Sequence, residues 1–471
     1  MHNEFWFKEK FQLKDFAQLE KRCQQANIKI SEHPEINLVN LSYSANASSN
    51  DFFTNCCRGL VLDKQTLAVV ARPFSRFFNY YEQNYQLLLD SAMDSPQFDC
   101  QTLEKIDGSL MKLFCYQGVW YVGTRSTAIA DTNVPNAKLN FYDLFVWALQ
   151  GKILSEQEVQ NFTIKRKELS QNQLASNQQF LQEFAQSENL DPNVTYVFEL
   201  CSPLNKGVLT YPLSVYFLAS LYNQQDEMNE IHYLPDSLDD NQGEAQQLLD
   251  ALQRQQTTIA HSSQDKPFST PTIRYPQSYQ FNTVHDMIES AKALQENGEG
   301  YVVYINGLPK VKIKSPAFVA RHHQGDDNEL SPNRMFEIIF AFEEDEWLAT
   351  FPDDASQILP YVSVRDTAIA QAQQLFYQVV AQFLDITQEN IEVGKDYKAM
   401  ITAQVQAQGK PELVSAMMKF VFSQAQTKGI AQLALSLLSG HGIEENFARM
   451  TANAQKRFIL DMMAVLDKSK N

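Results

Sequence analysis

The chain has 471 residues, 44% of them hydrophobic, and a formal net charge of −17. Its length favours two domains over a single core, and its acidity argues against a broad nucleic-acid-binding coat without excluding a local basic cleft. No apolar run reaches the roughly 18 residues that a membrane-spanning helix needs, and the first ten residues lack the apolar core of a signal peptide. Six cysteines without metal-ligand spacing favour free thiols and a cytoplasmic location. Because an apolar run of sufficient length is missing, no membrane partner is expected.

Short β-rich runs separated by turns occupy the first two thirds of the chain. β-branched and aromatic residues alternate with turn-forming residues, which is the pattern of antiparallel hairpins. The predicted strands are residues 59–63, 67–73, 109–114, 119–123, 196–200, 213–221, 301–304 and 310–314.

Polar, glutamine-rich segments lie between these runs, at residues 155–189 and 223–280. The first segment and residues 246–255 have helical composition, and the remainder indicates surface loops. After a polar linker at residues 322–328, Ser331 and Pro332 indicate a helix start, and helical apolar spacing follows to the C-terminus. We therefore predict an α+β domain over residues 1–322 and an all-helical domain over residues 323–471.

The sequence Lys105-Ile106-Asp107-Gly108-Ser109 places an amine on a tight bend before a strand. Such an amine can attack phosphorus only when it is unprotonated, and neighbouring cations or desolvation favour that state. An ordinary surface turn has the same composition, so the motif alone does not establish a nucleophile.

Four further charged residues lie in predicted strands or directly before one. Glu199 stands between apolar neighbours, and Glu299 enters a β-run beside Gly300, which permits close backbone approach. Lys312 and Lys314 alternate in the last strand and so project from one face of the sheet. Taken singly, the glutamates could face solvent, and the lysines could protect an exposed edge strand.

The order of nucleophilic lysine, two strand glutamates and paired lysines resembles the covalent nucleotidyltransferase superfamily of DNA ligases, RNA ligases and capping enzymes. Over about residues 40–320, the chain resembles the bacteriophage RNA ligase 1 family in particular. The segments that carry this closer resemblance are Arg58-Gly59, Arg72-Pro73, Phe77-Phe78-Asn79, the Lys105 motif and Ser202-Pro203-Leu204-Asn205-Lys206.

The resemblance implies an antiparallel-sheet nucleotidyltransferase domain, ATP-grasp-like, followed by the helical domain. It further implies that Lys105 attacks the α-phosphorus of ATP and becomes lysyl–AMP. AMP then passes to the 5′-phosphate of an RNA, and a 3′-hydroxyl displaces it to form a phosphodiester. Mg²⁺, with Mn²⁺ as the alternative, is the implied cation, and RNA, including broken tRNA, is the implied partner of a monomeric enzyme.

Roles for individual residues follow from the resemblance alone. Lys312 and Lys314 are expected to neutralise the α-phosphate, Glu299 to hold the metal, and Glu199 to contact the ribose or a metal-bound water. Arg58 is expected to bind phosphates. Phe78 is expected either to line the nucleotide pocket or to be a core residue. Arg76 and Arg125 are further predicted nucleotide contacts. They stand where the family has lysine, and Phe318 stands where it has tyrosine, so the details of ATP contact can differ here.

Three alternatives compete with an RNA ligase. A DNA ligase would carry a small β-barrel with an arginine motif, and Val364-Arg365-Asp366 resembles that motif only superficially because its surroundings have helical composition. A GTP-using capping enzyme would carry the same barrel. A non-catalytic RNA-binding protein would need neither a nucleophile nor metal carboxylates. The acidic run at residues 342–347 is predicted to be a solvated patch.

Overall fold

The structure is a computed structural model, and it divides into two compact units, Met1–His322 and His323–Asn471, each described by itself. Lys206, residues 246–255 and residues 323–328 of the predicted linker lie outside the described residues. The described residues are 2–44, 47–48, 51–80, 82, 85–135, 137–163, 174–205, 207–226, 259–294, 298–322, 332–351, 354–387, 390–391, 394–407, 412–448, 450 and 452–468.

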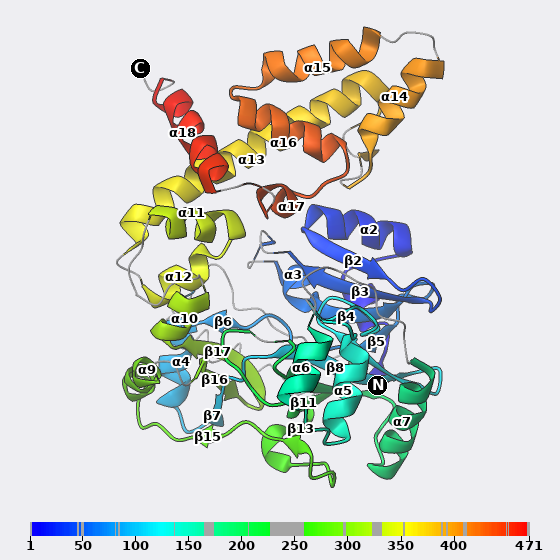
Figure 1. The fold of residues 1–471 in the computed structure, drawn as a ribbon, viewed down its shortest axis with the longest axis vertical. Helices are drawn as coiled ribbons and strands as arrows, with labels where there is room; N and C mark the ends of the chain where they lie inside the picture. Colours follow the sequence, from blue (N-terminus) through cyan, green and yellow to red (C-terminus); the bar gives the residue numbers. More distant parts are fainter. Residues whose placement is uncertain are drawn as a thin grey trace. The chain divides into compact units, whose positions relative to one another are not determined.

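A four-stranded antiparallel sheet in the order β2-β3-β4-β5 comes first in the chain (Figure 1). Leu41 of the sheet shares an apolar cluster with Phe7 and Leu19 of the preceding helices, and burial of such side chains drives the packing. Arg58 opens β4 directly after α3. The elements are α1 (Trp6–Lys10), α2 (Phe16–Gln25), β2 (Ile28–Glu32), β3 (Leu38–Tyr43), α3 (Phe52–Cys56), β4 (Arg58–Asp63) and β5 (Val69–Ala71).

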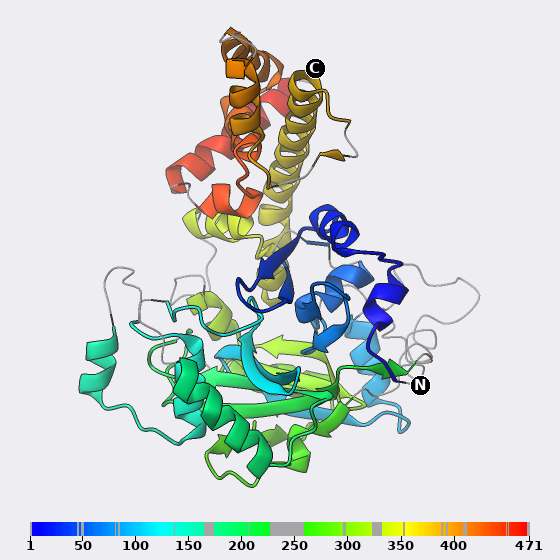
Figure 2. The same cartoon turned by 90° about the vertical axis from the view of Figure 1, so that its right-hand side faces the viewer.

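A six-stranded sheet forms the largest core of the first unit. Its strands follow the order β13-β11-β10-β8-β9, and β14 pairs with β11. Helices α5 and α7 pack against β11 and β9 (Figure 1 and Figure 2). The elements are β8 (Ser109–Tyr116), β9 (Val119–Thr124), α5 (Phe141–Leu149), α6 (Glu156–Phe162), α7 (Leu174–Ser187), β10 (Val194–Cys201), β11 (Ser214–Tyr222), β13 (Ile259–Ser262), η1 (Ser263–Asp265) and β14 (Ile273–Arg274).

A five-stranded sheet in the order β15-β7-β16-β17-β6 completes the first unit, with β6 parallel to β17. An apolar cluster that includes Leu103, Leu110, Val197 and Val302 joins it to the six-stranded sheet. The elements are β6 (Phe78–Asn79), α4 (Tyr85–Met93), β7 (Cys100–Glu104), β15 (Ser278–Tyr279), α9 (Val284–Ala293), β16 (Gly300–Ile305), β17 (Leu308–Lys314) and α10 (Pro316–His322), while β1 (His2–Asn3) pairs separately with β12 (Gln225–Asp226).

All eight predicted strands are confirmed, as β4, β5, β8, β9, β10, β11, β16 and β17. The mixed α+β character with antiparallel sheets is confirmed as well. Strand β7, which ends immediately before Lys105, was not predicted from the sequence. Its residues Cys100–Glu104 include only two buried side chains, so it lacks the alternating apolar pattern that identified the others.

The regular elements described in the second unit are helices (Figure 1). Its predicted helix start is observed at Pro332, the first residue of α11. The helices are α11 (Pro332–Ala341), α12 (Glu344–Thr350), α13 (Ala355–Leu384), α14 (Tyr397–Ala407), α15 (Glu412–Gln424), α16 (Lys428–Leu438), α17 (Ile443–Ala448) and α18 (Ala452–Lys468). Across the described part of both units, no helix has the length and apolar character needed to cross a bilayer.

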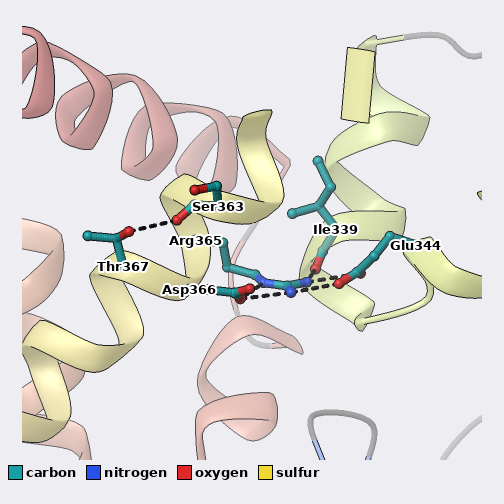
Figure 3. Close-up of polar contacts among 6 residues, drawn as sticks. All are labelled: Ile339, Glu344, Ser363, Arg365, Asp366 and Thr367. Atoms are coloured by element: carbon teal, nitrogen blue, oxygen red, sulfur yellow. Dashed lines mark hydrogen bonds and ion pairs between the residues drawn. The ribbon is translucent and has the colours of Figure 1, made fainter. Parts of the chain in front are cut away.

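Arg365 is a buried structural residue of α13 (Figure 3). Its guanidinium donates to both carboxylate oxygens of Glu344, at 2.6 and 2.9 Å, to Asp366 Oδ1 and to the carbonyl oxygen of Ile339. The helical surroundings predicted for the Val364-Arg365-Asp366 sequence are thus observed.

The acidic run at residues 342–347 departs from its prediction. Glu344 is 9% exposed and paired with Arg365, while Trp347 is fully buried and its indole N–H donates to Asp354 Oδ2 at 2.8 Å. The prediction of a solvated patch was wrong at these two positions. The partner that draws Glu344 inward lies on a different helix, out of reach of a local sequence pattern.

Candidate active site

A cavity of about 350 Å³ lies within the first unit, where residues from all three large sheets meet. Arg58 comes from the four-stranded sheet, Glu199 from the six-stranded sheet, and Val302 and Tyr304 from the five-stranded sheet. The remaining lining residues are Phe74, Phe77, Glu104, Lys105, Ile106, Gly108, Ser109, Leu110, Thr124, Arg125, Ser126, Phe141 and Leu218.

Lys105 occupies the bend between β7 and β8. Its backbone N–H donates to the carbonyl oxygen of Gly300 at 2.9 Å, which fixes the bend against β16. Gly108 allows the other side of the bend to lie close to β10, because a Cβ there would come within 2.5 Å of the carbonyl oxygen of Leu200. The Lys105 side chain is 20% exposed and reaches the cavity.

A single carboxylate oxygen connects Lys105 with Lys314. Glu299 Oε1 lies 2.9 Å from Lys105 Nζ and 3.4 Å from Lys314 Nζ, and the Glu299 side chain is 5% exposed. Glycine is required at position 300, where φ is +138° and a Cβ would lie 2.1 Å from the carbonyl oxygen of Ile313. The two lysines therefore converge on one buried carboxylate, although they are far apart in the sequence.

The paired lysines lie on β17 as predicted, opposite β16. Lys314 pairs with Gly300 and Lys312 with Val302 in the antiparallel register. The Lys314 amine also lies 5.5 Å from the centre of the Phe318 ring. Neither lysine is among the residues that line the cavity. Lys314 is connected to the cavity by Glu299, which contacts Lys105 in the lining.

Glu199 faces the cavity from β10. Burial raises the pKa of its carboxyl to about 7, and the negative charges of Glu299 and Asp107 act in the same direction, against the opposing effect of Lys105 and Arg58. Glu199 therefore changes charge close to neutral pH.

Three guanidinium groups surround the phenol of Tyr43. Arg76 and Arg125 lie 5.1 and 4.9 Å from the centre of its ring, and Arg58 shares a side-chain hydrogen bond with it. Burial raises the pKa of Tyr43, but Arg58, Arg125, Arg76 and Lys312 together lower it below the ordinary value. A concentration of positive charge strong enough to do this is a suitable environment for phosphate groups.

Arg58 has unused hydrogen-bonding capacity. Its Nη1 is buried and has no hydrogen-bond partner among the described residues. Such orphan donors are costly unless a ligand satisfies them. The guanidinium also lies 5.0 Å from the centre of the Phe77 ring, which lines the cavity beside it.

Phe78 corresponds to the core alternative in its prediction. Its side chain is 2% exposed, belongs to an apolar cluster and stacks on Tyr85 at 4.3 Å. Phe77, the preceding residue, lines the cavity in its place. Side chains of neighbouring residues in an extended chain point to opposite sides. The Phe77-Phe78 sequence therefore indicated a ring at the site but did not show which of the two would line the cavity.

The segment after Glu199 supports the Lys105 bend. Asn205 Nδ2 donates to Ser109 Oγ at 3.1 Å and to the carbonyl oxygen of Leu200 at 2.8 Å, while Ser202 Oγ accepts the backbone N–H of Asn205. In the sequence this segment was recognised only through the family resemblance.

Tyr43 and Phe77 were not predicted as individual site residues, because aromatic side chains next to apolar runs carry no distinctive local signal.

The structure thus brings most predicted site residues into one region. Glu199, which lines the cavity, and Glu299, which contacts Lys105, are the predicted metal carboxylates, and Glu104 and Asp107 lie in the same region. Within the described residues there is no group of three or more His, Cys, Asp or Glu side chains that could hold a metal alone. Carboxylates beside a cluster of guanidinium groups nevertheless suit Mg²⁺, which commonly binds one or two carboxylates together with substrate phosphates.

Comparison with known proteins gives consistent matches. A family model described as RNA ligase matches residues 56–318, more than half of the chain. A protein of Autographa californica nuclear polyhedrosis virus, described as a bifunctional polynucleotide kinase/RNA ligase, is 30% identical over 350 residues. That match covers 73% of this chain but only 42% of the viral protein.

Two solved structures are also similar. An archaeal ATP-dependent RNA ligase is 12% identical, with 87% of this chain and 80% of that chain covered and a TM-score of 0.37. An ATP-dependent DNA ligase from Aquifex aeolicus is 11% identical, with 73% and 76% covered and a TM-score of 0.34.

Proposed function

The chain belongs to the RNA ligase family, and from this premise we propose that it is an ATP-dependent RNA ligase that joins 5′-phosphate and 3′-hydroxyl ends. The reaction proceeds through a lysyl–AMP intermediate on Lys105 and then an RNA-adenylate. The observation that carries the proposal is the convergence of Lys105, Lys314 and Glu299 beside a cavity that also holds Arg58 and Glu199.

In the first step the Lys105 nitrogen forms a bond to the α-phosphorus of ATP, and the bond from that phosphorus to pyrophosphate breaks. The Lys105 amine must lose its proton for this attack. Glu299 Oε1, at 2.9 Å, holds the amine in place and is within reach of that proton. Because Glu299 also contacts Lys314, it connects the nucleophile with a cation that can neutralise charge developing on the α-phosphate.

The arginine cluster supports a site for the outer phosphates. Arg58, Arg76 and Arg125 surround Tyr43, and the orphan Nη1 of Arg58 offers a donor to an anion. Guanidinium groups bind phosphate oxygens in pairs of hydrogen bonds, which would orient pyrophosphate as the leaving group. Lys312 adds to the same positive field.

Glu299 and Glu199 are the residues that would hold a divalent cation, Mg²⁺ or Mn²⁺. Once bound there, the cation supplies positive charge that favours a neutral Lys105 amine and offsets charge on phosphate oxygens. The roughly neutral pKa of Glu199 fits a carboxylate that becomes fully charged only when a cation or nucleotide accompanies it.

Further parts of the proposal concern the two units. We assign residues 1–322 to an ATP-grasp-like adenylyltransferase domain and residues 323–471 to a helical domain that helps select RNA, such as a broken tRNA. The proposal includes a monomer that works in the cytoplasm, and the six free cysteines support a reducing compartment.

Incubation with radiolabelled ATP and Mg²⁺ tests the enzyme against a non-catalytic RNA-binding protein. We expect a covalent AMP label on the wild-type protein and none on Lys105→Ala. Lys64→Ala is the matched control, because Lys64 is an exposed lysine paired with Glu32 away from the cavity. Absence of label on the wild type would overturn the proposal, and labelling by GTP or NAD⁺ in place of ATP would overturn the choice of nucleotide.

A panel of nicked substrates separates an RNA ligase from a DNA ligase. We expect sealing of a nicked tRNA stem-loop and of single-stranded RNA ends, with little sealing of a nick in duplex DNA. Preferential sealing of the DNA nick would favour the DNA ligase alternative while leaving the lysyl–AMP step intact.

A further inference from the structure

One lysine of the first unit lies entirely inside the protein. Lys112 stands on β8, downstream of Lys105, and its side chain is 0% exposed. Its amine donates to the carbonyl oxygen of Gly59 at 2.6 Å and to Oδ1 of Asn40. Both acceptors are uncharged, and burial lowers the pKa of Lys112 well below the ordinary value. Burying an amine without an opposite charge is costly, so its position requires an explanation.

The two acceptors lead directly to the two cavity arginines. Gly59 follows Arg58 in the chain, so the Lys112 amine holds the peptide group next to Arg58. Asn40 Nδ2 donates to the backbone carbonyl oxygen of Arg125 at 3.2 Å. The Lys112 amine thus contacts the backbone beside one arginine directly and the backbone of the other through Asn40.

The surrounding backbone is shaped to admit this amine. A Cβ at Gly123 would lie 2.8 Å from Lys112 Cε, and a Cβ at Gly59 would lie 2.8 Å from the carbonyl oxygen of Arg125. Ser42 Oγ also donates to that carbonyl oxygen, at 2.6 Å. The β4 and β9 strands therefore approach each other around the network, with the two arginines at its edge.

We propose that Lys112 is a positioning residue that sets the spacing of the Arg58 and Arg125 guanidiniums for the outer phosphates of ATP. The inference rests on the proposed function, since it assigns those guanidiniums to the triphosphate. Lys112 itself touches neither the cavity nor the nucleotide, because it does not belong to the cavity lining. Removing its amine should affect ligands with outer phosphates more than ligands without them.

The test compares equilibrium binding of ATP and AMP to Lys112→Met, which keeps the length of the side chain and removes its donors. We expect the ratio of ATP affinity to AMP affinity to fall about tenfold, since small displacements of positioning groups have large effects. In single-turnover labelling, the ATP concentration that gives half of the maximal labelling rate should rise by a similar factor. Sealing of RNA that is already adenylated, which needs no triphosphate, should change by less than about threefold.

Thr195→Val is the matched control. Thr195 is also fully buried, and its hydroxyl accepts the backbone N–H of Arg72 at 3.1 Å and donates to Asn223 at 2.6 Å. It lies outside the cavity lining, so the variant should lose thermal stability while keeping the ATP-to-AMP ratio of the wild type. If Lys112→Met does not fold, Asn40→Leu serves in its place. It removes the hydrogen bond to the Arg125 backbone and leaves the bond from Lys112 to Gly59, so it should lower the ratio of ATP affinity to AMP affinity by a smaller factor.

The outcomes separate this inference from the proposed function. A folded Lys112→Met or Asn40→Leu protein with the wild-type ATP-to-AMP ratio would overturn the positioning role, even if the wild type forms lysyl–AMP. The opposite result is also informative. If the wild type forms no lysyl–AMP but binds ATP more tightly than AMP, and the two variants lose this preference, the proposed function is overturned and the positioning role is kept.

Discussion

Two clusters of charged side chains, one in each unit, use their polar atoms very differently. In the second unit, every nitrogen of the Arg365 guanidinium donates to an oxygen of Glu344, Asp366 or Ile339 (Figure 3). In the first unit, Lys105 and Lys314 share one oxygen of Glu299 beside an open cavity, and a nitrogen of Arg58 has no partner among the described residues.

On the proposed function, this difference separates a structural cluster in the second unit from a catalytic cluster in the first. Because its nitrogens are all hydrogen-bonded, Arg365 has no donor left for a ligand. Its hydrogen bonds contribute to the stability of the second unit. Incomplete satisfaction next to a cavity is costly for folding and is retained where a substrate completes the set. Charge and burial alone would not have separated the two clusters.

Breaking the saturated cluster should give the largest change in stability. Arg365→Met leaves Glu344 buried without its partner, and we expect the second unit to lose about 3–5 kcal/mol. Chemical denaturation followed by far-ultraviolet circular dichroism measures this loss. The double variant Arg365→Met with Glu344→Leu should recover part of it, and a single variant as stable as the wild type would contradict the structural role.

Breaking the shared carboxylate should affect activity more than stability. Glu299→Ala removes the contact between Lys105 and Lys314, and we expect self-adenylylation to slow by about 10²–10³-fold. Glu344→Ala is the counterpart in the other cluster and should label at close to the wild-type rate while melting at a lower temperature. Comparable rate losses in the two variants would contradict the division between the clusters.

The charge of Glu199 should appear in the pH dependence of the reaction. Because burial raises the pKa of this carboxyl to about 7, the charged form is lost as pH falls through 7. We expect kcat/KM for ATP to fall up to about tenfold per pH unit below 7. The inflection should disappear in Glu199→Gln, and its persistence there would assign it to another group.

The same carboxyl should have the opposite effect on stability. Its raised pKa means that the folded protein binds more protons than the unfolded chain between about pH 4.3 and 7. Its contribution to stability is therefore fully present below that window and is lost as pH rises to 7. The difference in unfolding free energy between the wild type and Glu199→Gln, measured across this range, checks the sign.

The smallest effects should separate the two adjacent phenylalanines. Phe77→Leu removes the ring beside Arg58 and should raise the KM for ATP by about two- to tenfold, as expected for a cation–π contact. Phe78→Leu should mainly lower the melting temperature, since that ring stacks in the core. The reverse result would show that Phe78 serves the nucleotide and Phe77 the core.

The sequence predicted those parts of the molecule that leave a local pattern. The eight hairpin strands and the Lys105 bend were accessible because alternation and turn residues record them. The contacts between Lys105 and Glu299, or between Arg365 and Glu344, join distant segments and leave no such record. The ordered resemblance to a family nevertheless assigned Lys105 and Glu299 to one site. The resemblance included the Phe77-Phe78 pair without showing which ring enters the cavity, and nothing in the sequence indicated Tyr43 or Lys112, whose roles depend on what surrounds them in space.

On the proposed function, Lys105 becomes covalently adenylylated. Mass spectrometry of the protein after incubation with ATP and Mg²⁺, followed by sequencing of the modified peptide, tests it most directly. We expect one AMP per chain, located on Lys105 and released as ATP when pyrophosphate is added. AMP on another residue, or an unmodified Lys105 in a protein that still seals RNA, would contradict it.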